Sequence, residues 1–147
     1  MSDQQQQSEK YEETEARRDV HIEKEKRSLY TDLRTKETSP FYEVDLHDLF
    51  TFAMAYGRRK AGSVELDGKE HALFGRSSLR EEQEGVIEAI AVREERSLEV
   101  LRDERFVYEI AEEYANGGIE KLHGRVFGPE DDALSELTME VVEEYEG

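Results

Sequence analysis

The sequence predicts a mainly α-helical fold with one short strand near the N-terminus. Apolar residues recur at intervals of three and four in several segments, which is the spacing of one face of a helix. Val20 and Ile22 alternate with polar residues over Asp19 to Glu25, the period-2 pattern typical of a strand. The chain has 147 residues, a length that fits a single domain.

The strand is predicted to bury Val20 and Ile22 and to turn the carboxylates around them outward. Ser28 is suited to cap a short helix that runs to Lys36. With the helix that follows, the order is strand, helix, helix, which is the order of a ribbon-helix-helix unit.

The clearest helix is predicted over residues 46–56. Asp45 is a good N-cap, and Gly57 is expected to end the helix. Its apolar residues form a face broader than a small monomer covers easily, and exposed apolar patches usually indicate an interface. We therefore predict an interface with a second copy or a partner protein through six residues of this helix: Leu46, Leu49, Phe50, Phe52, Met54 and Tyr56.

The remaining elements are predicted from turn and helix signals. A small irregular hairpin is expected over residues 63–74, with Asp67-Gly68 as its turn. A helix follows that contains Gly85, whose cost of roughly 1 kcal/mol relative to Ala suggests a packing reason. Asp103 caps another helix, which Asn116-Gly117-Gly118 is expected to break, and a short last helix is expected over 119–128.

Three parts of the chain differ in composition. Residues 1–18 are polar and contain one large apolar residue, Tyr11, so we expect a disordered tail. Residues 19–128 form the predicted helical domain. Residues 129–147 are strongly acidic but keep apolar residues at helical spacing, so a docking helix and a solvated tail both stay open.

The charge balance is strongly acidic. The net charge is −17, with 39% of residues charged against roughly 25% in an ordinary protein. Dense carboxylates suit a salt-rich cytosol, where repulsion is screened, so we expect a halophilic source; an acidic mesophilic protein is the alternative. Residues 1–80 carry 16 acidic and 14 basic side chains, whereas residues 81–147 carry 21 and 6.

Several classes of chemistry lack their residues. The chain has no cysteine, which excludes disulfides, thiolate catalysis and cysteine-ligated metals. No nucleophile elbow or phosphate-binding glycine loop is present. Because these catalytic residues and motifs are missing, we expect a protein that is not an enzyme and needs no cofactor. No apolar run could span a membrane and no secretory leader opens the sequence, so we expect a cytoplasmic location.

Two groups of residues carry a weak metal signal. Asp45, His47 and Asp48 fall in one turn and could bind a hard cation, although helix capping explains both aspartates. Asp67-Gly68-Lys69 together with Asp45 or Asp48 resembles the carboxylate and lysine set of restriction-type nucleases. Because Asp-Gly is first of all a turn, we expect no metal site and keep a metal-dependent nuclease as an alternative.

Basic residues cluster in the first half of the chain, where the charge is nearly balanced. A sequence-tolerant contact with DNA phosphates is predicted there. Base readout by the strand is not expected, because its outward carboxylates would be repelled by phosphates. The predicted patch consists of eight residues: Arg17, Arg18, Lys24, Lys26, Arg27, Arg58, Arg59 and Lys60.

Two motifs carry a family resemblance. Asp48-Leu-Phe-Thr-Phe-Ala-Met-Ala-Tyr-Gly57 and Tyr114-Ala-Asn-Gly-Gly-Ile119 resemble segments of the small dnd system-associated proteins, and the order of elements is similar to that of the DndE-like helical subunits. The resemblance covers about residues 19–126. It implies a part in DNA phosphorothioation, an anti-phage defence, with other dnd-system proteins as partners and an oligomeric state.

The resemblance and the residues together predict a non-catalytic accessory subunit of a phosphorothioation-based modification or restriction system. It would act by assembly, as a homo-oligomer or in a heteromeric complex, and by contact with DNA. The nuclease and a DNA-binding regulator of the ribbon-helix-helix type are the alternatives.

Overall fold

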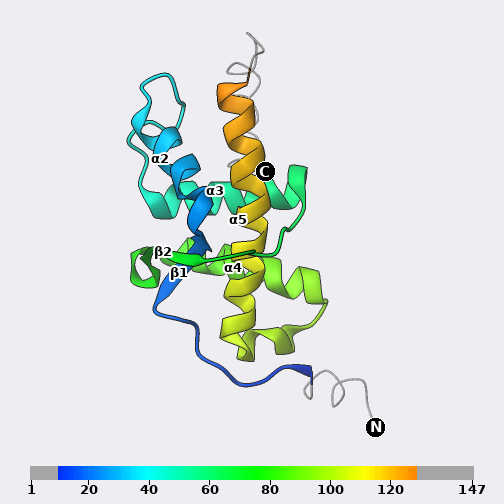
Figure 1. The fold of residues 1–147 in the computed structure, drawn as a ribbon. Coiled ribbons are helices and arrows are strands. Elements are labelled where there is room, and N and C mark those ends of the chain that lie inside the picture. Colours follow the sequence, from blue (N-terminus) through cyan, green and yellow to red (C-terminus); the bar gives the residue numbers. More distant parts are fainter. Residues whose placement is uncertain (1–9, 129–147) are drawn as a thin grey trace.

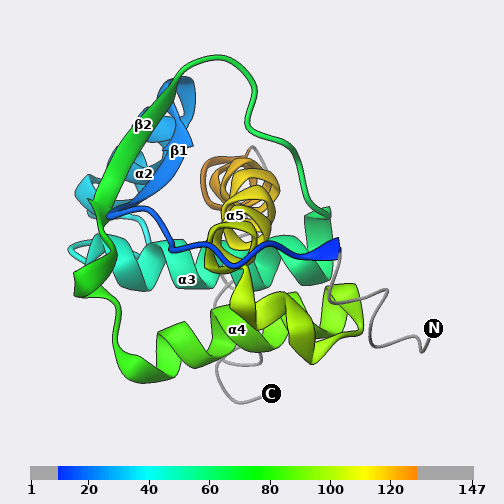
Figure 2. The ribbon, with the colours of Figure 1, turned by 90° about the horizontal axis from the view of Figure 1, so that it is seen from below.

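The computed structural model describes residues 10–128 and is organised around one long helix, α5 (Glu104–Phe127). Viewed along α5, helix α3 (Leu46–Tyr56) lies below it, and helix α2 (Arg27–Thr35) with a two-stranded sheet lies to its left (Figure 2). Helix α4 (Glu81–Glu95) runs beside α3 and also contacts α5. The mainly helical fold with a short N-terminal strand is confirmed (Figure 1).

The strand β1 (Asp19–Glu23) forms where it was predicted, and Val20 and Ile22 are buried. Its partner is the antiparallel strand β2 (Glu70–Gly75), with a bulge between Val20 and His21. The predicted hairpin over residues 63–74 is wrong, because residues 62–69 form a loop in which Val64 N–H donates to the Glu113 carbonyl of α5. The chain shares the order strand, helix, helix with a ribbon-helix-helix unit. It differs in strand pairing, because β1 pairs with β2 of the same chain.

Two details of the first half differ from the predictions. Glu23 is buried at the end of β1, although it was expected to face outward. Helix α2 begins after Lys26 and not at a Ser28 cap, and it buries Tyr30 and Leu33. The one-turn helix η1 (Lys24–Lys26) links β1 to α2 without a break, so the start of α2 is set by this turn.

Helix α3 has the predicted bounds, with Asp45 at the N-cap position. Gly57 does not end it, because the chain continues in the π-helical turn η2 (Gly57–Ala61) and leaves at Gly62, whose φ is +87°. Five of the six predicted interface residues are at most 2% exposed: Leu49, Phe50, Phe52, Met54 and Tyr56. They are core residues covered by the rest of the same chain, and Leu46 is half-buried.

The prediction that Asn116-Gly117-Gly118 breaks the last helix is wrong, because α5 is continuous. The glycines serve the crossing of α5 with α3. A Cβ at Gly118 would lie 1.9 Å from the Ala53 carbonyl oxygen, and a Cβ at Gly57 would lie 1.9 Å from the Tyr114 carbonyl oxygen. The two helices therefore touch backbone to backbone, which only glycine permits.

Other predicted elements of the second half are closer to the structure. Asp103 does cap α5, since its side chain accepts from Phe106 N–H, and α5 ends at Gly128. Gly85 in α4 has no packing reason, because a Cβ there would meet nothing within 4 Å. The turns η3 (Arg76–Ser78) and η4 (Leu98–Arg102) connect β2 to α4 and α4 to α5.

The predicted disorder of residues 1–18 differs from the structure at residues 10–18. Tyr11 is 4% exposed, and its hydroxyl donates to Glu95 at 2.9 Å. Residues 1–9, and the predicted docking helix or acidic tail over 129–147, lie outside the described residues. None of the helices in the described part is both long and apolar enough to span a membrane.

The backbone contact of α3 with α5 predicts a large difference between two glycines of one helix. Gly118→Ala should lower the free energy of unfolding by more than about 2 kcal/mol, because the new methyl group has no room. Gly124→Ala should raise it by about 0.5–1 kcal/mol, since that position is open and Ala favours the helix. Urea unfolding of the two variants measures this, and equal effects would contradict the crossing.

Candidate functional site

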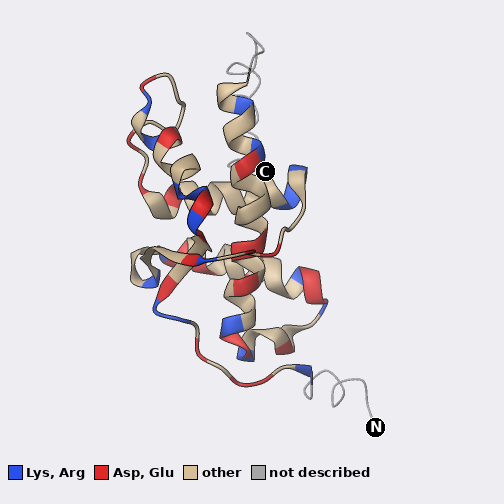
Figure 3. Cartoon of the chain, in the orientation of Figure 1, with Lys and Arg blue, Asp and Glu red and all other residues tan. Residues whose placement is uncertain are grey.

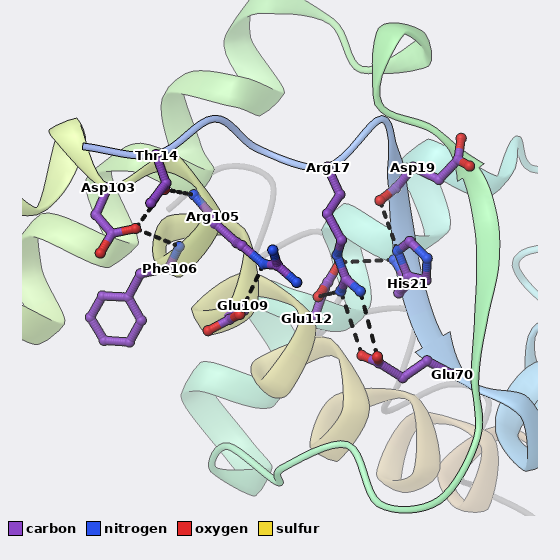
Figure 4. Close-up of polar contacts among 10 residues, drawn as sticks. All are labelled: Thr14, Arg17, Asp19, His21, Glu70, Asp103, Arg105, Phe106, Glu109 and Glu112. Atoms are coloured by element: carbon purple, nitrogen blue, oxygen red, sulfur yellow. Dashed lines mark hydrogen bonds and ion pairs between the residues drawn. The ribbon is translucent and has the colours of Figure 1, made fainter. Parts of the chain in front are cut away.

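The most buried acid in the described part of the chain is Glu112, on the side of α5 that faces β1. It is 3% exposed. One carboxylate oxygen accepts from His21 N–H at 2.8 Å, and the other from the Arg17 guanidinium at 3.1 Å. Arg17 also reaches Glu70 on β2, at 3.5 Å (Figure 4). Arg17 thus joins the N-terminal segment, α5 and the sheet in one charge cluster.

Burial dominates the chemistry of this cluster. Removal of the Glu112 carboxyl from water raises its pKa to about 7, and the neighbouring Glu70 acts in the same direction. The bonds from His21 N–H and Arg17 oppose this rise and do not overcome it. Glu112 therefore exchanges a proton near neutral pH while it is held by two donors.

A second buried cluster fastens the loop of residues 62–69 to α5. The Asn116 side-chain amide donates to Glu23, at 2.9 Å, and to the carbonyls of Val64 and Glu65. Glu23 also accepts from Asp67 N–H at 2.8 Å. Burial raises the pKa of the Glu23 carboxyl, but these two hydrogen bonds together with the positive charge of Lys26 outweigh it, and the net pKa is lowered. Asn116 and Glu23 are thus tie points of the fold.

Asp45, His47 and Asp48 do come together, with their ligand atoms within 4.8 Å of one another. The Asp48 carboxylate is engaged by Arg80, at 2.9 Å, and by the Gln83 amide, at 2.8 Å. No side-chain capping bond is made by Asp45. This turn joins α3 to the start of α4, and its carboxylate Asp48 is already neutralised by an arginine.

The nuclease alternative rests on Asp67 and Lys69 together with Asp45 or Asp48. Asp67 lies in the loop whose backbone is bound by Glu23, and Lys69 follows it with its carbonyl accepting from Lys24 N–H. The cluster of possible metal ligands found among residues 10–128 contains neither Asp67 nor a second acid from this loop. Asp67-Gly68 acts as a turn, with Gly68 at a φ of +79°.

The predicted basic patch is divided by acidic partners. Lys26 donates to the Asn116 carbonyl and pairs with Glu120, and Arg58 pairs with Glu94 at 3.1 Å. Arg27 donates to the Ala72 carbonyl. The exposed members are Arg18, Lys24, Arg27, Arg59 and Lys60. Lys and Arg are interspersed with Asp and Glu along most of the ribbon, and η2 carries basic residues in succession (Figure 3).

Sequence reasoning missed the buried polar residues of α5. Glu112 and Asn116 lie four residues apart, and Ile119 follows three residues later, so all three share one helix face. Ile119 is fully buried, and Glu and Asn are seldom buried without partners. The sequence signal for this burial is the helical spacing of these polar residues with an apolar residue of the same face.

One family model matches the chain, over residues 19–146: DNA sulphur modification system-associated protein 4. The match covers most of the chain. The chain belongs to this family. The dnd-associated resemblance is thereby confirmed, and the match includes β1, α5, the cluster of Glu23 and Asn116, and the Glu112 cluster apart from Arg17. No curated protein and no solved structure matches the chain.

The raised pKa of Glu112 predicts a pH-dependent stability. The folded state holds this proton more tightly than the unfolded chain, whose carboxyl has its ordinary pKa of 4.5. The group's stabilising contribution is therefore complete below pH 4.5 and is lost as pH rises through about 7. Glu112→Gln should gain stability relative to the wild type between pH 4.5 and pH 8, on the order of 2–3 kcal/mol.

Urea unfolding at the two pH values measures this difference. Glu104→Gln, an exposed residue of the same helix, is the control for the loss of one negative charge. A pH dependence of Glu112→Gln equal to that of the wild type would contradict the assignment.

Proposed function

We propose that this protein is a non-catalytic accessory subunit of a DNA sulphur-modification system and acts by assembly with other proteins of that system. The family match supports the association with sulphur modification. The accessory role is supported by how the acidic side chains are used within residues 10–128. Glu112, Glu23 and Asp48 each accept from donors on other elements, which is the behaviour of structural tie points.

A catalytic site usually presents a nucleophile or base with an orienting group around an open cavity. The cavity between α3 and α4, of about 350 Å³, is lined mainly by apolar atoms, with Arg80 at its edge. Arg80 is bound to Asp48 there. Such a cavity favours contact with another protein over bond-breaking chemistry.

DNA contact is proposed at η2, where residues 57–64 contain three basic residues and no acid. Lys121 of α5 extends this surface, since its amine donates to the Lys60 carbonyl. The other half of the predicted patch is opposed by Glu23 and Glu120, which pair with Lys26. A basic surface that reads only phosphates binds DNA without sequence preference.

The accessory role predicts partners and no cleavage. A tagged copy expressed in its native host should co-purify with proteins of the sulphur-modification system. The purified protein should leave supercoiled plasmid intact with Mg²⁺ or Mn²⁺, whether or not the plasmid carries phosphorothioates. Nicking that disappears in Asp67→Ala and Lys69→Ala would establish the nuclease instead, and Glu104→Ala is the control for loss of an unrelated carboxylate.

The proposed DNA contact predicts a position-specific charge effect. Lys60→Glu with Lys121→Glu should weaken DNA association of the assembled complex several-fold. The slope of log affinity against log salt should fall by roughly 2, since each lost phosphate contact removes about 0.9. Lys24→Glu with Lys69→Glu makes the same charge change on exposed residues near β1 and should have little effect. Equal effects of both pairs in a gel-shift titration would contradict contact at η2.

A further inference from the structure

Residues 10–18, here called the strap, lie in extended form beside η4 and the first half of α5 (Figure 4). Tyr11 stacks on Phe106 with ring centroids 6.2 Å apart. Thr14 N–H donates to the Arg102 carbonyl at 3.2 Å, and the Thr14 hydroxyl donates to Asp103 at 2.7 Å. At the C-terminal end of the strap, Arg17 pairs with Glu112. The strap is thus held along its whole length by a surface of the later half of the chain.

The surface under the strap's C-terminal end is an acidic groove. A cavity of about 250 Å³ remains there with the strap in place, and Arg17 is the strap residue in its wall. Burial and the neighbouring Glu65 and Glu109 raise the pKa of Glu113 in this groove, so its carboxylates repel one another. Five carboxylates line it, with Arg17 of the strap and Arg105 as the opposing charges: Glu65, Glu70, Glu109, Glu112 and Glu113.

The strap matches this groove poorly in charge. It carries three basic and three acidic residues, so its own net charge is zero. Glu12, Glu13 and Glu15 are exposed and add to the negative field of the chain. The arginine at position 17 supplies the strap's compensating charge at the buried carboxylate.

The strap also contributes little to the core. Tyr11 is its one buried side chain. Its backbone forms an isolated bridge between Thr14 and Asp103 and accepts from Arg76 N–H at Arg18. Segments with few buried contacts open at a small fraction of the cost of global unfolding. The family match begins at residue 19, so the groove lies within the family's domain and the strap lies before it.

We propose that the acidic groove and the adjoining surface at Phe106 and Asp103 form a docking site for an extended, arginine-bearing segment of a partner protein, and that the strap lies there as a displaceable intramolecular ligand. The partner's arginine would take the place of Arg17 between Glu112 and Glu70. An aromatic residue six positions before it would take the place of Tyr11 on Phe106. Basic residues between these two would be attracted where the strap's own glutamates are repelled.

This inference deepens the proposed assembly function and names the chemistry of the partner. It is tested with a labelled peptide that has the sequence of residues 9–19, with lysine in place of Glu12, Glu13 and Glu15. The receptor is the full chain, either wild type or with Tyr11→Ala and Arg17→Ala to weaken the strap. Fluorescence anisotropy should show at least tenfold tighter binding to the variant, because the wild-type strap competes from within the same molecule.

Two control peptides separate specific docking from attraction to an acidic protein. Citrulline in place of Arg17 keeps the shape and removes the charge, and should weaken binding at least tenfold. A scrambled peptide of the same composition should also bind at least tenfold more weakly. Equal binding of the scrambled peptide, or no binding to the strap variant, would overturn the proposal.

Hydrogen exchange on the wild-type chain tests displacement without any substitution. Saturating peptide should speed exchange in residues 10–18 and leave residues 119–127 of α5 unchanged. Strap exchange that occurs only with global unfolding would overturn the proposal, as would a dimer in which two copies exchange straps, because the ligand would then be a second copy. Failure to recover partners from the host would count against the proposed function and would leave the peptide result standing.

Discussion

The fold depends on the contact of two helix backbones at Gly57 and Gly118. Side chains normally hold packed helices 8–10 Å apart, and glycine at the crossing removes that spacer. Because the two helices approach more closely than that, α5 covers the apolar side of α3, including Phe50 and Met54, which are fully buried. The broad apolar face that suggests an intermolecular interface in the sequence is therefore satisfied within the chain. This contact with α3 also determines which face of α5 is left to pack against the sheet.

On that remaining face, polar residues replace apolar packing. Asn116 holds the loop before β2, and Glu112 holds the backbone of β1, so the sheet is positioned by hydrogen bonds to one helix. Buried carboxylates of this kind are costly unless donors reach them. In a chain of net charge −17, the ionised forms of Glu23 and Glu112 contribute to the repulsion. Their position between elements indicates that they specify the arrangement of β1, β2 and α5 in addition to any effect on stability.

The sequence was sufficient for the elements whose signals are local. The bounds of α3, the strand β1 and the Asp103 cap all rest on residues close to one another in the chain, and all are found. The errors concern residues whose role depends on distant partners. Gly117 and Gly118 have the composition of a helix break, but they lie inside a helix. Their close neighbours are Gly62 and Ala53, some 60 residues earlier in the chain. Likewise β2 pairs with β1, about 50 residues earlier, and not with the segment just before it.

The candidate site divides in the same way. The turn with Asp45, His47 and Asp48 is local, and its residues do lie together. The basic residues could be found by counting charges, but their acidic partners lie on other elements, as Glu94 does for Arg58. The cluster of Arg17, Glu112 and Glu70 joins residues from three separate parts of the chain, and neither periodicity nor a motif relates them.

The order of elements has a consequence for how the chain is made. The helix around which the domain is built is the last of the described elements to leave the ribosome. At roughly 5–20 residues per second, α3 is synthesised several seconds before the helix that covers it. During that interval the aromatic residues of α3 are not yet covered by α5. The strand β1 likewise has no partner until β2 has been synthesised. Nascent chains of this protein are thus at greatest risk of aggregation between the synthesis of α3 and that of α5. A messenger truncated before residue 104 would yield a product that a chaperone or protease must remove.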